Sequence, residues 1–287
     1  MKALLLAVAQ LALAALAVGC RSAPVSTTAD QPIRVLLVGS KPTWSFRYFT
    51  NAWQRAKNVE LLRHLAGVGD SPFGKNMLAT LPETVADWQK HDVVVLCEWN
   101  ASQADEDCVS SLAQFVADGG GLITIAEGKS ANSLRDNRWR TLLPVRLAAG
   151  PARAEPTKTA LAVASGAEEH PALQCCGADE VETVLPTLPE LYFTPLVESL
   201  AADAKALVQA KAIAQVPANT VMAIRPVGKG FSLWIGTDEL WRWRDPHAER
   251  YMDAFAVSAV RAVAINRLAR TGFATSGWGS ASDESGK

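Results

Sequence analysis

The chain has 287 residues, of which 49% are hydrophobic and 20% are charged, and its formal net charge at pH 7 is −1. These values are typical of a globular protein with one large or two small domains. A nearly neutral chain without a long basic run lacks the electrostatic footprint of a nucleic-acid-binding protein, so we expect no nucleic-acid partner.

The amino terminus has the pattern of an export signal. Lys2 is followed by an apolar run over residues 4–18 and by small residues that lead to Cys20. A basic start, a short apolar core and small residues before a cysteine are typical of a signal peptide that ends in a bacterial lipobox. The pattern predicts a signal peptide over residues 1–19 and lipidation of Cys20; an ordinary signal peptide with an unmodified cysteine is the alternative.

The lipid would hold the protein to a membrane of the cell envelope, facing the periplasm. Residues 20–31 are rich in Ser, Thr, Ala and Pro and predict a tether. Arg21 follows the cysteine where Asp would favour the inner membrane, which favours the outer membrane. A single α/β domain is expected over residues 32–270, followed by a disordered Ser- and Gly-rich tail over residues 271–287.

Buried strands and amphipathic helices alternate along the first half of this domain. Apolar runs that end at Gly or at polar residues predict strands buried on both faces. Apolar residues at helical spacing predict the helices between them. The alternation predicts a doubly wound, mostly parallel sheet with helices on both faces. The predicted strands are residues 33–39, 59–65, 92–97 and 122–126, and the predicted helices are residues 44–55, 82–89 and 103–118.

The second half is less regular. Residues 148–217 contain many prolines that mark loops, with a strand expected at 160–164 and a strand or helix at 206–214. Residues 220–226 and 230–236 predict two strands around a Gly-rich turn. The last helix is expected over residues 245–270.

Catalytic side chains are sparse. Cys97 ends a predicted strand, and a structural strand-end thiol is favoured over a nucleophile because no histidine is visibly paired with it. Cys97 and Cys108 are close enough in sequence to form a disulfide, with two thiols as the alternative. Glu127 occupies a strand–turn and is a weak candidate for a base. No His-x-x-x-His spacing occurs, so neither a metal nor a cofactor is predicted.

Two patches rich in aromatic and basic residues follow predicted strands. One contains Trp44 and Arg47, and the other contains Arg242 and Arg244. Because ligands bind at the carboxyl ends of strands in open α/β sheets, these four residues are candidate ligand-binding residues. The alternative is that the tryptophans seal the sheet edge while the arginines pair with acidic neighbours.

Taken in order, several segments resemble the glutamine-amidotransferase-like domain of bacterial membrane-associated proteins. The resemblance covers most of residues 32–268 and implies the flavodoxin-like fold of class I glutamine amidotransferases. The matching segments are Pro42, Trp44, Arg47 and Tyr48, residues 92–96, residues 119–123, the Gly-Lys-Gly of residues 228–230, and the Gly-Thr-Asp-Glu-Leu-Trp-Arg-Trp-Arg of residues 236–244.

The resemblance argues against glutaminase activity. Active members use a cysteine at a strand–turn and a late histidine with a glutamate, whereas the turn here has no cysteine and Thr237 stands where the histidine is expected. The first hypothesis is therefore a non-catalytic, lipid-anchored domain that binds an envelope partner protein or a small ligand. The expected cleft is lined by Trp44, Arg47, Asp238, Glu239, Arg242 and Arg244.

Two alternatives remain open. One is a hydrolase in which a carboxylate of Glu127, Asp238 or Glu239 acts as the base. The other is a purely structural envelope lipoprotein, which a deep polar cleft would disfavour.

Overall fold

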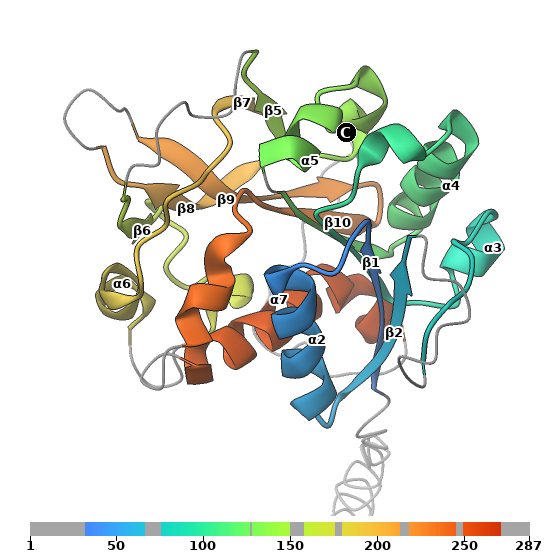
Figure 1. Cartoon of the computed structure of the whole chain (residues 1–287), viewed down its shortest axis with the longest axis horizontal. Coiled ribbons are helices and arrows are strands. Elements are labelled where there is room, and N and C mark those ends of the chain that lie inside the picture. Colours follow the sequence, from blue (N-terminus) through green and yellow to red (C-terminus); the bar gives the residue numbers. More distant parts are fainter. Residues whose placement is uncertain are drawn as a thin grey trace, which may run out of the picture.

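The computed structural model describes residues 32–66, 76–126, 128–149, 158–175, 180–212, 218–244 and 249–270. They form an α/β fold in which one eight-stranded sheet has the order β2-β1-β3-β4-β10-β9-β8-β6 (Figure 1). The first five strands in this order run parallel to one another, and each of the last three runs antiparallel to the strand before it. The predicted α/β class and mostly parallel sheet are therefore confirmed.

The parallel strands are β1 (Ile33–Gly39), β2 (Val59–Leu65), β3 (Val93–Cys97), β4 (Gly121–Ile125) and β10 (Gly230–Ile235), and the antiparallel strands are β9 (Asn219–Val227), β8 (Lys205–Ala210) and β6 (Leu161–Val163). Strands β5 (Val145–Leu147) and β7 (Val197–Leu200) form a separate two-stranded ribbon. The α-helices are α2 (Trp44–Arg55), α3 (Val85–Trp88), α4 (Glu106–Ala117), α5 (Gly128–Ser133), α6 (Val181–Val184) and α7 (Glu249–Arg270). Short 3₁₀ helices are η1 (Ala101–Gln103), η2 (Asn137–Thr141), η3 (Pro171–Leu173), η4 (Leu185–Thr187) and η5 (Glu239–Arg244).

Side chains of β1 alternate between two hydrophobic cores, one on each face of the sheet. Val35 and Leu37 belong to the core that contains buried residues of α2 and α7, whereas Leu36 and Val38 belong to the core that contains those of α4. A strand covered on both faces must be apolar at consecutive positions, which explains the continuous apolar runs of the sequence.

Local capping fixes where the helices begin. The Thr43 hydroxyl accepts a hydrogen bond from the Phe46 amide at 3.2 Å, and an Asp105 carboxylate oxygen accepts one from the Cys108 amide at 2.7 Å. Each contact satisfies an amide that the helix itself leaves without a partner. The cap at Thr43 starts α2 close after β1 and so places its first turn at the carboxyl edge of the sheet.

The Gly-Lys-Gly segment before β10 serves close packing. A Cβ atom at Gly230 would lie 2.2 Å from the carbonyl oxygens of Gly120 and Val116, and Gly228 has a φ of +58°. Neither position accepts a side chain without displacing the backbone of α4 and the turn that follows it. This part of the resemblance therefore reflects packing rather than a ligand site.

Most expected elements of the first half match in type and position. The strands at 33–39 and 59–65 and the helix at 44–55 have the predicted bounds, while the helix expected at 82–89 is only the single turn α3. The ambiguous segment at 206–214 is strand β8, and the ribbon of β5 and β7 was not predicted. Cys97 and Cys108 keep their thiols and do not form a disulfide.

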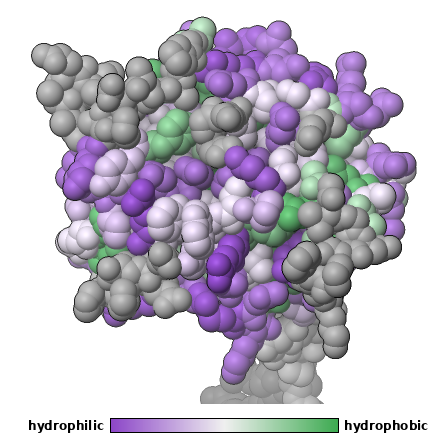
Figure 2. Space-filling view, viewed as in Figure 1, coloured by the Kyte–Doolittle hydropathy of each residue, from purple (hydrophilic) through white to green (hydrophobic). Residues whose placement is uncertain are grey.

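The face shown in Figure 2 is largely hydrophilic, with hydrophobic residues in small separate areas. Among the described residues, the large hydrophobic side chains that are exposed are Trp44 and Leu196. Isolated apolar residues are normal on a protein surface, so exposure alone does not mark Trp44 as a functional residue.

Candidate functional site

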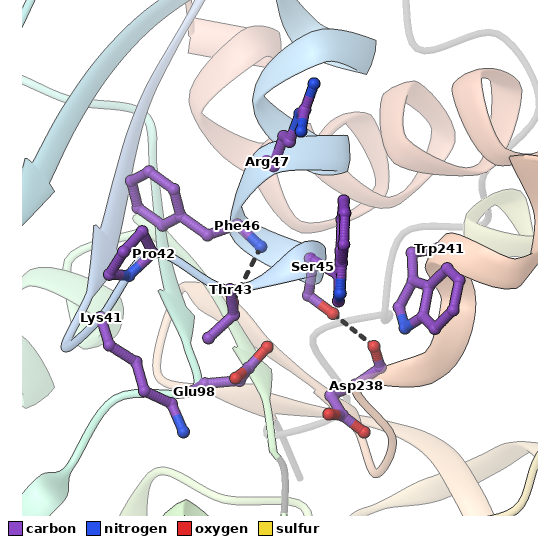
Figure 3. A pocket seen from close by; sticks show the side chains of 10 residues that line it. Lys41, Pro42, Thr43, Ser45, Phe46, Arg47, Glu98, Asp238 and Trp241 are labelled. Carbon is purple, nitrogen blue, oxygen red and sulfur yellow. Dashed lines mark hydrogen bonds between the residues drawn. The ribbon is translucent and has the colours of Figure 1, made fainter. Parts of the chain in front are cut away.

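A cavity of about 590 Å³ lies at the carboxyl edge of the parallel strands (Figure 3). Its walls come from the segment between β1 and α2 together with the first turn of α2, from Glu98 directly after β3, and from Asp238 and Trp241 after β10. Helices α2 and α4, which follow β1 and β3, cover opposite faces of the sheet. Such a divergence opens a crevice at the carboxyl ends of the two strands.

A hydrogen bond joins the two sides of this cavity. The Ser45 hydroxyl, in the first turn of α2, donates to the backbone oxygen of Asp238 at 2.5 Å. Ser45 is buried, so this contact is shielded from competing water. The bond fixes the amino terminus of α2 against the segment that leads into η5.

Glu98 has an unusual backbone conformation. Its φ is +51°, and Asn76 is the other described non-glycine residue with a positive φ. The Glu98 amide donates to the Ile125 carbonyl at 2.8 Å, and only 3% of the residue is exposed. A non-glycine residue in this region costs energy and is held there by its surroundings, which is a feature of many functional sites.

Charged groups of both signs face the cavity. Figure 3 shows the carboxylates of Glu98 and Asp238 and the ammonium group of Lys41 around the same space, while the Arg47 side chain extends away from the two carboxylates. The lining offers both acceptors and donors of strong hydrogen bonds.

The aromatic rings of Trp44 and Trp241 line part of the cavity. The Trp44 ring is 53% exposed, and its centroid lies 6.0 Å from that of Trp241 and 6.0 Å from that of Tyr48. The Arg47 guanidinium lies 5.7 Å from the centroid of Trp44. Half-exposed indoles beside polar groups provide an apolar surface against which a ligand can pack.

Glu239 and Arg242 are not among the residues that line this cavity. The carboxylate of Glu239 is mostly buried and accepts hydrogen bonds from the Arg242 guanidinium at 3.1 and 3.2 Å. Its other oxygen accepts from the Phe193 amide at 2.9 Å and from the Tyr192 amide. We call these four residues the η5 bracket, because they fasten η5 to the segment before β7.

Aromatic rings hold the cation of this bracket in place. The guanidinium carbon of Arg242 lies 4.7 Å from the Tyr192 ring centroid and 4.8 Å from that of Trp241. A guanidinium between two rings and bound to a carboxylate has little capacity left for a ligand. Arg242 therefore serves the stability of η5, and the side chain of Arg244 lies outside the described part of the chain.

Thr237 is also structural. The residue is fully buried, and its hydroxyl accepts a hydrogen bond from the Glu239 amide at 3.1 Å. This contact satisfies an amide at the start of η5, as hydroxyl side chains commonly do at helix starts. At the place where the resemblance calls for a catalytic histidine, the chain has a helix cap.

The predicted site residues thus fall into four groups. Trp44, Arg47 and Asp238 lie around one cavity, whereas Glu239 and Arg242 are turned away from it. Glu127 and Cys20 lie outside the described residues. Cys97 is completely buried in the core beneath the sheet edge.

Sequence reasoning missed Lys41, Ser45 and Glu98 as lining residues. Glu98 carried a usable signal, because it is the first polar residue after the most regular buried strand of the sequence. Lys41 precedes the first patch and Ser45 lies within it, and neither shows a pattern of its own. Within the described ranges, no group of three or more His, Cys, Asp or Glu side chains is placed to hold a metal ion.

No family model matches the sequence, and no curated protein matches it. Solved structures do resemble the fold. Cytoplasmic protein STM1381 of Salmonella typhimurium LT2 matches with a TM-score of 0.60 at 14% identity, over 80% of this chain and 99% of that chain. Cytoplasmic protein STM3548 of Salmonella typhimurium matches with a TM-score of 0.59 at 15% identity and the same coverage.

These likenesses concern the fold, because the identities are low. A β-galactosidase from Rahnella sp. R3 matches with a TM-score of 0.49 at 12% identity, over 80% of this chain and 31% of that enzyme. A TM-score of that size supports no conclusion about this chain.

The predicted location in the cell envelope is contradicted by these neighbours, both of which are described as cytoplasmic proteins. The prediction of a signal peptide, a lipoprotein and a periplasmic or outer-membrane location is therefore withdrawn. It rested on residues 1–31, which lie outside the described part of the chain. Short apolar runs are ambiguous, because a buried segment of a soluble domain has the same composition. None of the described helices is long and apolar enough to cross a membrane.

Proposed function

We propose that the chain is a flavodoxin-like domain, similar to class I glutamine amidotransferases but without their chemistry, that binds a small polar ligand. The observation that carries the proposal is the convergence of Trp44, Glu98, Asp238 and Trp241 on one cavity of about 590 Å³. These residues come from three segments far apart in sequence, and cavities of this volume are typical of small-molecule sites.

The strand order supports the flavodoxin-like part of the proposal. Flavodoxin-like sheets have parallel strands in the order 2-1-3-4-5, and their ligands bind where the order reverses between β1 and β3. The parallel part of this sheet has the order β2-β1-β3-β4-β10, with β10 in the fifth place. The cavity lies at the ends of β1 and β3, which is the place where this topology leaves room for a ligand.

The contacts of the residues at the expected catalytic positions support the proposal that the domain lacks amidotransferase chemistry. Thr237 caps η5, and the Glu239 carboxylate is occupied by Arg242 and by two backbone amides. A base needs a free lone pair directed at the reacting group, which Glu239 does not offer. Cys97 is buried and is therefore not accessible to a substrate.

The lining chemistry indicates what kind of ligand fits. Lys41 contributes a positive charge beside the two negative charges of Glu98 and Asp238, and the Arg47 guanidinium lies farther away, at the Trp44 ring. A site with charges of both signs favours a ligand that both donates and accepts hydrogen bonds over a strongly charged one. The rings of Trp44 and Trp241 suit an apolar face of the same ligand.

Ligand binding can be tested by screening polar metabolites for a change in tryptophan fluorescence and in melting temperature. Glu98→Gln and Asp238→Asn should each weaken binding of any hit at least about tenfold, because each removes a charged acceptor from the cavity. Asp253→Asn is the matched control, since Asp253 pairs with Arg55 at 2.5 Å and is not among the lining residues. Equal affinities in all three variants would reject the cavity as the binding site.

A hydrolase with a carboxylate-based site is the second candidate. It is favoured by one observation, the two carboxylates of Glu98 and Asp238 that face the same space (Figure 3). Pairs of carboxylates can divide the roles of acid and base. Chromogenic ester, amide and glycoside substrates should show no turnover if the domain only binds. Turnover that Asp238→Asn abolishes and Asp253→Asn preserves would establish the hydrolase instead.

A further inference from the structure

A second cavity, of about 170 Å³, lies between η2 and the ribbon of β5 and β7, and no function described above involves it. It shares no lining residue with the cavity at Trp44. In Figure 1 this ribbon lies beside α5 at one end of the molecule. Because Arg135, Arg140 and Arg146 all line this cavity, we call it the arginine pocket.

The charges around the arginine pocket do not balance. Asp136 and Glu198 are the acidic lining residues. Asp136 is already bound to Arg138, whose guanidinium donates to one carboxylate oxygen at 3.1 Å and whose amide donates to the other at 2.9 Å. Arg140 and Arg146 therefore share the pocket with one carboxylate, that of Glu198, which is not engaged in this way.

Both of these guanidinium groups are available to a ligand. Arg140 and Arg146 are exposed, and neither side chain forms an ion pair with a carboxylate of the described residues. The indole N–H of Trp139, in the wall of the pocket, has no hydrogen-bond partner in the described chain. Both guanidinium and indole are donor-only groups, so the lining is rich in donors and poor in acceptors.

The backbone that carries these arginines is held firmly. The Arg225 guanidinium contacts the carbonyl oxygens of Arg140 and Leu143, both at 3.4 Å, and pairs with Asp203 at 2.9 Å. The Arg138 guanidinium donates to the Ala104 carbonyl at 2.8 Å. Trp139 is buried among the residues of the core on this face of the sheet. A fixed backbone lowers the entropic cost of gathering arginines around a ligand.

We propose that the arginine pocket binds a phosphoryl group. Guanidinium forks match the geometry of phosphate oxygens and bind them through two parallel hydrogen bonds. The volume of the pocket suits a single tetrahedral group rather than an extended chain. Excess positive charge selects an anion, and a dianion gains more from it than a carboxylate does.

The proposal is tested with the full chain, titrated with inorganic phosphate at constant ionic strength and followed by the amide chemical shifts of residues 134–147. Saturable shifts are expected. Arg140→Gln and Arg146→Gln should each raise the Kd about tenfold, because each removes a charge-assisted contact. Glu198→Gln should lower the Kd severalfold, since it removes the opposing charge. Lys57→Gln, an exposed charge change away from the pocket, should leave the Kd unchanged.

The opposite signs expected for the arginine and glutamate variants separate binding from unfolding, because a misfolded variant only loses affinity. O-phosphoserine and glycerol phosphate in parallel titrations distinguish a phosphoprotein source from a phospholipid headgroup by which of them binds more tightly. The absence of a saturable shift with phosphate, or a Kd that both arginine variants leave unchanged, would overturn the proposal.

Discussion

The sides of η5 and of the residue before it differ in what they contact, although the segment is short. Asp238 and Trp241 line the cavity, whereas Glu239 and Arg242 form the bracket with Tyr192 and Phe193. Leu240 and Trp243 make a third row that is buried in the core. A 3₁₀ helix has three residues per turn, so residues three apart share one side. The comparison teaches that neighbouring Trp and Arg residues in this segment have different roles because they lie on different rows.

The largest loss of stability is expected for substitutions in the third row, which is buried in the core. Trp243 is 1% exposed and packs edge-on against Phe255 at 5.8 Å. Trp243→Ala should lower the free energy of unfolding by about 3–5 kcal/mol, because it leaves a large cavity in the core. Trp241→Ala, on the cavity row, should cost about 1 kcal/mol, since the ring is partly solvated. Chemical denaturation measures both, and equal losses would refute the assignment of rows.

The second-largest loss of stability is expected for the row of Glu239 and Arg242, which belongs to the η5 bracket. Glu239→Ala should lower the free energy of unfolding by about 2–4 kcal/mol, because Arg242 and two backbone amides lose a buried acceptor. Asp238→Asn, one residue earlier, should cost less than about 1 kcal/mol. Urea midpoints that coincide for these two variants would show that the bracket contributes nothing specific.

Buried histidines provide a contrast to the buried charge of Glu239. Burial, with a smaller contribution from the charge of Lys205, lowers the pKa of His170 to about 4, and burial together with the charge of Arg34 lowers that of His91 to about 4. In the folded chain the His170 Nδ1 accepts the Ala172 amide at 3.2 Å, a contact that needs this nitrogen unprotonated.

Between pH 6.5 and 4 the unfolded chain binds more protons at these histidines than the folded chain does. Stability from this source is therefore present above about pH 6.5 and is lost as the pH falls toward 4. The expected loss is on the order of 1–2 kcal/mol per histidine, reduced by residual solvation. Urea denaturation at pH 7 and pH 5 measures it, and His170→Asn should flatten the curve. An unchanged slope in that variant would rule out His170 as a source.

The smallest effect belongs to the cap of η5. Thr237→Val removes the hydroxyl that accepts the Glu239 amide and should cost about 1 kcal/mol. Thr237→Ser keeps the acceptor and should remain closer to the parent chain in a thermal melt. A serine variant as unstable as the valine variant would assign the role of Thr237 to packing of its methyl group instead.

The sequence predicted the long helices and strands better than the short ones. The strand at 33–39 and the helix at 44–55 have the expected bounds, because a long apolar run defines the strand and the Thr43 cap defines the start of the helix. The strand at 59–65 also has the expected bounds. The ribbon strands β5 and β7 have three and four residues, too few for any period to be read. Their conformation depends on tertiary contacts instead.

The site was accessible to sequence reasoning only in part. The expected topology predicted that both aromatic patches lie at the carboxyl edge of the sheet. In the structure the ring centroids of Trp44 and Trp241 are 6.0 Å apart. The rows of η5 depend on its 3₁₀ pitch, which residue composition does not reveal. The location of the chain was predicted from a terminal pattern alone and was wrong in light of the cytoplasmic neighbours.

Strand β10 lies inside the sheet, between β4 and β9, although it follows all the other described strands in the sequence. Until it emerges from the ribosome, the finished strand β4 presents an open, apolar edge to the cell. An unpaired strand edge can pair with other nascent chains. The partly synthesised chain is therefore prone to aggregate until β10 has been made. Deletions that end before Gly230 should make that risk permanent, because they remove the strand that closes the edge.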